Sequence, residues 1–215
     1  MSAQAQTTAS LEKDWWLRLG LVFTRPHLVF AWLRDDTDEA AHARQEPILL
    51  VGFLAGLAGV LSSNGLGHAL DDFGLDGVDL AVTAFFAALL YGLVGYFALG
   101  ALVYLGEQLA GSLGTYRRSR HVLAFACAPL ALSLTMWPIR LALYGEDNFR
   151  SGGSDSGTGG AIFEAIEVAV VVWCLVLLAI GIKETNGWTW PRALAATAVP
   201  ALVPIAAFAR AYGLF

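Results

Sequence analysis

Four ionisable residues in or beside long apolar stretches are the strongest candidates for chemistry in this sequence. Glu164 and Glu167 are one helical turn apart, so their side chains share one face of a helix. Arg140 and Arg210 come near the ends of two other apolar stretches. Because an Arg side chain can bind a carboxylate through two hydrogen bonds, we predict a polar cluster of these four residues in which Arg140 pairs with Glu164 or Glu167.

Such a cluster has three interpretations. It can be a structural group of ion pairs, a site for a polar substrate or lipid headgroup, or an acid/base site. Neither a nucleophile nor a histidine lies near it at a recognisable spacing, so the acid/base interpretation is the weakest. We therefore expect no enzyme activity and no cofactor.

Other candidate ligands are weaker still. His68 with Asp71 and Asp72 is a metal-binding combination, but one His and two carboxylates in a Gly-rich loop are commonly just solvated, so no metal site is predicted. Cys127 and Cys174 both fall inside apolar stretches, where cysteines behave as small buried hydrophobic residues.

The elements that position these residues are five apolar stretches. Their bounds are about 48–61, 80–106, 122–139, 168–182 and 193–209. A transmembrane helix needs roughly 20 mostly apolar residues to cross the hydrocarbon. With 57% hydrophobic and 14% charged residues, the chain has too little polar surface for a soluble fold of 215 residues. The prediction is an all-α, polytopic membrane bundle of five transmembrane helices.

The chain before the first span has a different composition. Residues 1–10 are polar and small and predict a disordered tail, and residues 11–46 predict a cytoplasmic, interfacial helical segment with short amphipathic helices. Residues 47–215 form the predicted five-helix domain. Trp15, Trp16 and Trp32 are typical of headgroup-level anchors. A partner-binding helix of the same composition is the alternative.

The basic residues set the predicted orientation, because Lys and Arg near helix ends stay on the cytoplasmic face. Arg117, Arg118 and Arg120 form a basic loop between the second and third spans, on the same side as the five basic residues that precede the first span. This places the N-terminus in the cytoplasm and the C-terminus outside. The net charge of −5 provides no basic patch for nucleic acid.

Small residues and prolines indicate how the spans pack. Small residues recur at four-residue spacing in three pairs: Gly52 and Gly56, Ala55 and Gly59, and Ala88 and Gly92. They predict close helix contacts within the bundle, with a homodimer seam as the alternative. Prolines predict bends in the third span, at Pro129 and Pro138, and in the fifth, at Pro200 and Pro204.

Two stretches carry a resemblance to a known family. From Leu109 to Pro129, a Gly-rich, basic connection precedes a span that contains proline. From Trp173 to Leu194, a Trp-led apolar run ends in a glycine and a charged pair, followed by an Arg-Ala-Leu entry to the last span. In these features the chain resembles the Yip1 domain family of five-span membrane proteins, over about Pro26 to Pro204.

The resemblance implies a membrane-organising role. Eukaryotic members are associated with Rab GTPases and vesicle formation, but their cytosolic Asp-Leu-Tyr-Gly-Pro motif is absent from this sequence. The closer likeness is to prokaryotic members, which implies a plasma membrane, the prokaryotic cytoplasmic membrane. We expect a non-enzymatic protein whose partners are membrane lipids and a second copy or another membrane protein. The alternative is a small transporter, channel or lipid-moving protein that uses the Arg/Glu cluster.

Overall fold

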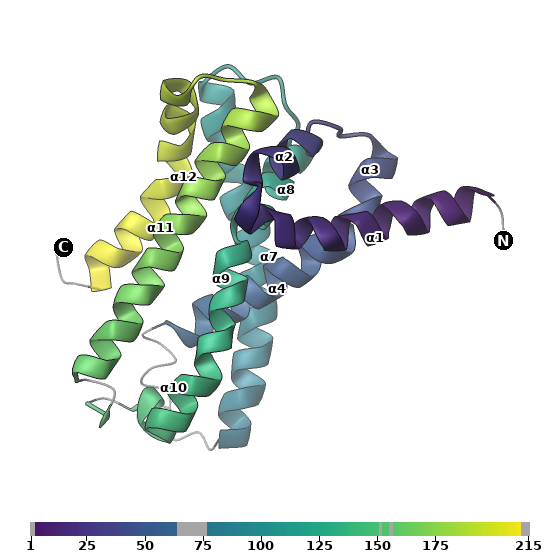
Figure 1. Cartoon of the computed structure of the whole chain (residues 1–215). Helices are drawn as coiled ribbons and strands as arrows, with labels where there is room; N and C mark the ends of the chain where they lie inside the picture. The colour runs from purple at the N-terminus through teal and green to yellow at the C-terminus, as the bar shows by residue number, and fades with distance from the viewer. Residues whose placement is uncertain (1–2, 64–76, 151, 155–156, 212–215) are drawn as a thin grey trace.

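The structure, a computed structural model, describes residues 3–63, 77–150, 152–154 and 157–211, and these residues are helical with no strand (Figure 1). The helices of the first half are α1 (Ala3–Thr24), α2 (Pro26–Trp32), α3 (Asp38–Ala43), α4 (Gln45–Leu61) and α7 (Gly77–Leu109). The second half contains α8 (Tyr116–Ala126), α9 (Ala128–Ser133), η1 (Leu134–Met136), α10 (Trp137–Tyr144), η2 (Gly145–Phe149), α11 (Thr158–Asn186) and α12 (Trp190–Ala211).

Four helical stretches are long and apolar enough to cross a membrane. They are Gly77–Leu109, Tyr116–Phe149, Thr158–Asn186 and Trp190–Arg210. They correspond to the last four predicted spans, and with the absence of strands from the described residues they confirm the all-helical class. The remaining predicted span is α4, which is apolar but has only 17 residues.

The third span is a chain of short helices, as its prolines predict. Pro129 lies in the first turn of α9 and Pro138 in the first turn of α10, where a missing backbone N–H is tolerated. The helix therefore breaks at Cys127, just before α9. Pro200 and Pro204 differ, because α12 stays helical through both and changes direction along its length (Figure 1).

A close helix contact joins α4 and α7. A Cβ added to Gly56 would lie 2.6 Å from the Ala88 carbonyl oxygen and 2.6 Å from the Gly92 amide nitrogen. A Cβ added to Gly92 would lie 2.7 Å from the Gly52 carbonyl oxygen. These small residues therefore form a contact within the bundle, as predicted. Gly59 does not take part, since a Cβ there would meet nothing within 4 Å.

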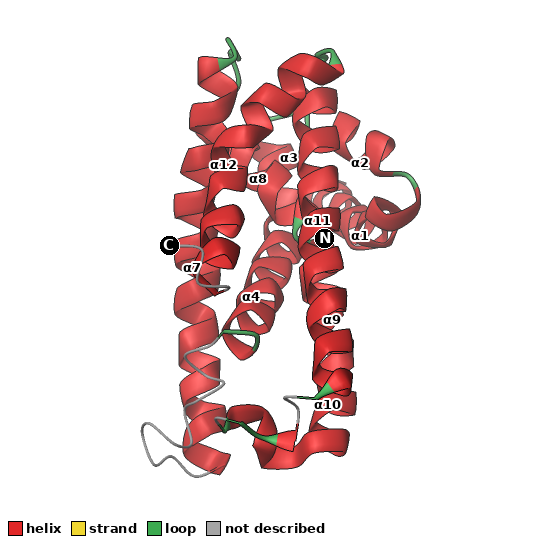
Figure 2. Cartoon of the chain, turned by 90° about the vertical axis from the view of Figure 1, so that its left-hand side faces the viewer, coloured by secondary structure: helices red, strands yellow, loops and turns green. Residues whose placement is uncertain are grey.

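The N-terminal segment packs on one end of the bundle and belongs to its core. Val22 of α1 and Phe30 of α2 are fully buried, in one cluster with Val122 of α8 and Ile182 of α11. Figure 2 shows α1, α2 and α3 gathered beside α8 and the end of α11. Helix α1 begins at Ala3, within the residues 1–10 for which the sequence predicts a disordered tail.

The Gly56 contact leads to a test by substitution. We expect Gly56→Ala to lower the free energy of unfolding by about 1–3 kcal/mol, because its methyl group must push two backbones apart. Gly59→Ala is the matched control: it adds the same methyl group to the same helix in open space and should leave stability unchanged. Thermal unfolding in detergent measures both variants, and equal unfolding temperatures would refute the contact.

Candidate functional site

The buried guanidinium of Arg44 lies at the centre of the main polar site. Arg44 separates α3 from α4, and its side chain is 0% exposed. Burial lowers the pKa of this guanidinium below its usual value, and the neighbouring Asp36 carboxylate opposes that shift. An Arg side chain nevertheless stays charged in a protein, so the surrounding residues must neutralise it and accept its hydrogen bonds.

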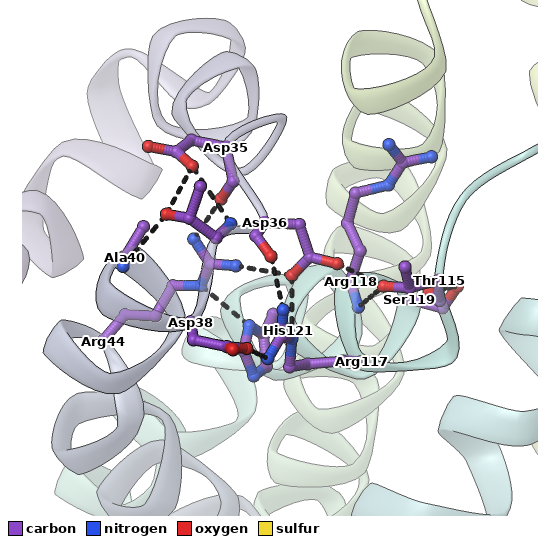
Figure 3. Close-up of polar contacts among 11 residues, drawn as sticks. Asp35, Asp36, Asp38, Ala40, Arg44, Thr115, Arg117, Arg118, Ser119 and His121 are labelled. Atoms are coloured by element: carbon purple, nitrogen blue, oxygen red, sulfur yellow. Dashed lines mark hydrogen bonds and ion pairs between the residues drawn. The ribbon is translucent and has the colours of Figure 1, made fainter.

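Asp36 provides the neutralising carboxylate and joins two parts of the chain. One of its oxygens accepts hydrogen bonds from Nη2 of Arg44 and from Nε of Arg117, both at 3.1 Å. Its other oxygen accepts from the Thr115 hydroxyl, and its backbone carbonyl from Nη2 of Arg117 (Figure 3). The turn between α2 and α3 is thus bound to the first turn of α8.

The other donors of Arg44 are also satisfied. Its Nε donates to Nδ1 of His121 at 2.7 Å, and its Nη1 donates to the backbone carbonyl of Asp35 at 2.7 Å. Since an Arg can only donate, the acceptor nitrogen of His121 carries no proton, so this ring is neutral with its hydrogen on Nε2. We call Asp36, Arg44, Thr115, Arg117 and His121 the Asp36 network.

A second buried group lies on the opposite side of α8. Glu107 of α7 is 1% exposed, and its carboxylate accepts from the Ser119 hydroxyl and, at 2.6 Å, from the Asn186 amide. The Asn186 side-chain oxygen in turn accepts from Nη2 of Arg118 at 2.9 Å and from the Ser112 hydroxyl at 2.6 Å. This Glu107 network connects α7, α8 and the end of α11.

The three arginines of the predicted basic loop therefore have different partners. Arg117 belongs to the Asp36 network and Arg118 to the Glu107 network. Arg120 does neither: its guanidinium carbon lies 4.6–5.0 Å from the ring centres of Tyr96, Phe97 and Tyr116. Cations are attracted to such aromatic faces. All three residues lie in α8, so this loop is the first part of a helix.

The predicted Arg/Glu cluster is present only in part. Nη1 of Arg140 in α10 lies 2.7 Å from the Glu167 carboxylate in α11, which confirms the predicted pairing. Glu164 is exposed and makes no ion pair with a described residue. Arg210 is exposed at the end of α12 and does not join this pair within the described chain. Of these four residues, the described chain thus brings together Arg140 in α10 and Glu167 in α11, near the end of the bundle opposite α8 (Figure 1).

The three predicted interfacial tryptophans have different environments. Trp16 and Trp32 are 39% and 38% exposed, as surface anchors are expected to be. Trp15 is 3% exposed and packs on Phe125, with ring centres 5.4 Å apart. Trp15 thus lies in the core that holds α1 to α8. His68, Asp71 and Asp72 lie outside the described residues.

Sequence reasoning missed both polar networks. From the sequence, Arg117 and Arg118 are interpreted only as topology signals, and no role is assigned to Asp36. The sequence contains one signal for the second network. Glu107 directly follows the apolar stretch 80–106, and a carboxylate next to a membrane-length helix needs hydrogen-bond donors.

The Yip1 domain model matches residues 20–211, nearly the whole chain, from the end of α1 through α12. The chain belongs to the Yip1 domain family. This confirms the resemblance, and with the apolar helices it identifies a multi-pass integral membrane protein. No curated protein and no solved structure matches this Yip1 domain chain.

The Asp36 network leads to a test by matched substitutions. Asp36→Ala leaves the buried Arg44 charge without its carboxylate, which typically costs about 3–5 kcal/mol. Asp38→Ala removes another carboxylate bound to Arg117, at 2.6 Å, but Asp38 is 97% exposed, so its loss should cost about 1 kcal/mol or less. Thermal unfolding measures stability, and hydrogen exchange in α1–α3 measures their release. Equal effects of the two changes would contradict the role of Asp36.

Proposed function

We propose that this chain is a non-enzymatic membrane protein that organises lipids and partner membrane proteins through its N-terminal segment. One observation carries the proposal: the Asp36 network fixes α1–α3 on the bundle while these helices leave large apolar side chains uncovered. Trp16, Leu17 and Leu28 are 39%, 66% and 46% exposed. A fixed apolar surface of this kind is typical of membrane or protein contact.

The same surface suggests how the chain lies in the bilayer. In this proposal α1 and α2 lie in the cytoplasmic interface, with Trp16 and Trp32 at headgroup level. The paired charges of Arg44 and Asp36 then lie at the membrane surface, where desolvation is less costly than in the hydrocarbon. This arrangement agrees with the expected interfacial segment.

Helix α4 is the fifth span in this proposal. Its first turn follows Arg44, beside the Asp36 network, and its last residues, Val60 and Leu61, pack with Leu80 near the start of α7. It therefore extends along α7 from the network to the opposite end. Seventeen residues rise about 26 Å, slightly less than the hydrocarbon thickness. Local thinning of the bilayer or polar flanking residues can accommodate the difference.

The polar side chains favour a structural role over transport. Asp36, Arg44 and Glu107 bind their own neighbours, and Arg140 binds Glu167. Transporter sites instead direct charged groups at a substrate near the middle of the membrane. A small transporter or lipid-moving protein is therefore the less favoured alternative. A second copy of this chain or another membrane protein is the expected partner.

We infer an orientation with the N-terminus in the cytoplasm, the C-terminus outside and the chain in a prokaryotic plasma membrane. The likeness to prokaryotic members supports the compartment, and the basic residues support the orientation. Cysteines at Leu113 and Ser154 test the orientation, because both positions are exposed and lie at opposite ends of the bundle. An impermeant thiol reagent applied to intact cells should label S154C and not L113C, with Cys127 and Cys174 replaced. The reverse pattern would overturn the orientation.

The organising role is testable through the exposed apolar surface. We expect the chain, extracted in polymer-bounded membrane discs, to be enriched in particular lipids and membrane proteins relative to the bulk membrane. Replacing Trp16 and Leu28 together by alanine should remove this enrichment, because both side chains are exposed and free of the core. Lipid mass spectrometry and quantitative proteomics of the discs provide the measurement.

Replacing Trp190 and Leu194 by alanine is the matched control. These residues are of the same two types, 44% and 55% exposed on α12, and their loss should preserve the enrichment. A wild-type disc with the composition of the bulk membrane would refute the organising role. Solute flux through sealed vesicles that contain the purified chain would favour the transporter alternative instead.

A further inference from the structure

A groove between α1, α2 and α3 combines a cation, two carboxylates and two indole rings. Its volume is about 450 Å³, within the usual range for small-molecule sites. Trp15 and Arg18 line it from α1, Trp32 from α2, Asp35 from the following turn and Glu39 from α3. None of these side chains binds the central carboxylate of the Asp36 network, so the groove is a separate feature of the N-terminal segment.

Arg18 is held in place by aromatic faces. Its guanidinium carbon lies 4.5 Å from the ring centre of Trp15 and 4.3 Å from that of Trp32. Within the described chain Arg18 makes no hydrogen bond or ion pair. A guanidinium stacked on aromatic rings still has its N–H donors in the plane of the group, and their geometry matches the oxygens of a phosphate. The cationic part of the groove therefore suits a phosphate.

The carboxylates suit a group of the opposite charge. One Asp35 oxygen accepts hydrogen bonds from the Thr37 amide at 3.1 Å and from the Thr37 hydroxyl at 2.9 Å. These bonds hold the pKa of Asp35 below its usual value, so this carboxyl is charged at neutral pH. Glu39 is exposed in the first turn of α3 and makes no ion pair within the described residues. Acidic groups that line the same groove as a phosphate-binding cation favour a zwitterionic ligand.

We propose that this groove binds the phosphoethanolamine headgroup of a membrane lipid, with the phosphate on Arg18 and the ammonium on Asp35 and Glu39. An ethanolamine ammonium donates three hydrogen bonds to carboxylates, whereas the trimethylammonium of choline donates none. A phosphatidylglycerol headgroup has no ammonium to offer. The assignment deepens the proposed function and rests on it, since it requires α1–α3 to lie at the membrane surface.

The test uses the full chain in detergent, titrated with lipids of identical acyl chains and followed by native mass spectrometry. Phosphatidylethanolamine should bind more tightly than phosphatidylcholine or phosphatidylglycerol. Arg18→Gln should weaken phosphatidylethanolamine binding about tenfold, as expected for a lost charged hydrogen bond. Arg25→Gln is the matched control: it removes the same charge from an exposed position outside the groove and should have no effect.

A second variant keeps the test valid if Arg18→Gln does not fold. Glu39 is exposed, so Glu39→Gln should fold normally and reduce the preference for phosphatidylethanolamine over phosphatidylglycerol roughly two- to fivefold. Glu46→Gln, also exposed but outside the groove, should leave that preference unchanged. Equal binding of the two lipids, unaffected by Glu39→Gln, would overturn the assignment.

Two further outcomes separate the explanations. Soluble glycerophosphoethanolamine should displace the lipid only in large excess. If it binds as tightly as the lipid does, the ligand of the groove is a soluble molecule and the lipid assignment is wrong. Phosphatidylethanolamine binding that survives Arg18→Gln but is lost on replacing Trp16 and Leu28 would refute the groove and leave the organising role intact.

Discussion

The ion pair between Arg44 and Asp36 holds the N-terminal segment on the membrane bundle. Arg44 has no exposed surface, and a buried guanidinium is tolerated only when a carboxylate and further acceptors surround it. Asp36 lies in the turn between α2 and α3, and its second partner, Arg117, lies in α8. The position of α1–α3 therefore depends on the same charges that satisfy Arg44. The apolar contacts of Trp15 and Phe30 stabilise this position but do not determine it, because the hydrophobic effect is non-directional.

Because the third predicted span breaks, the short helix α8 can contact both polar networks. Thr115 caps α8 by accepting from the Arg118 amide at 3.1 Å, and the helix ends at Ala126. Arg117 and His121, one turn apart, face the Asp36 network, while Ser119 reaches Glu107 on the other side. A continuous helix from residue 116 to 144 would have a single axis. That one direction would have to serve both the contacts of α8 and the packing of α10. The break at Cys127 lets α8 take its own direction.

The sequence predicted what depends on composition and local geometry. Long apolar runs located four membrane-length helices, the prolines located the breaks of the third predicted span, and the loop that follows this span brought Arg140 close to Glu167. It could not predict Arg44 with Asp36, because burial of that pair depends on how the turn before α3 and the residue after α3 both pack against α8. For the same reason Trp15 looked like an interfacial anchor, although α8 covers it.

The two ends of the bundle use charge differently. Near α10, the pair of Arg140 and Glu167 joins two helices, and aromatic rings flank the guanidinium, with ring centres 4.7 Å away at Trp137 and 5.4 Å away at Phe163. Near α8, the polar groups join four parts of the chain and lie beside the exposed surface of α1–α3. The pair of Arg140 and Glu167 stabilises a contact between two helices, whereas the linked networks also position a surface segment relative to the bundle. The N-terminal end is therefore where the proposed organising function has its physical basis.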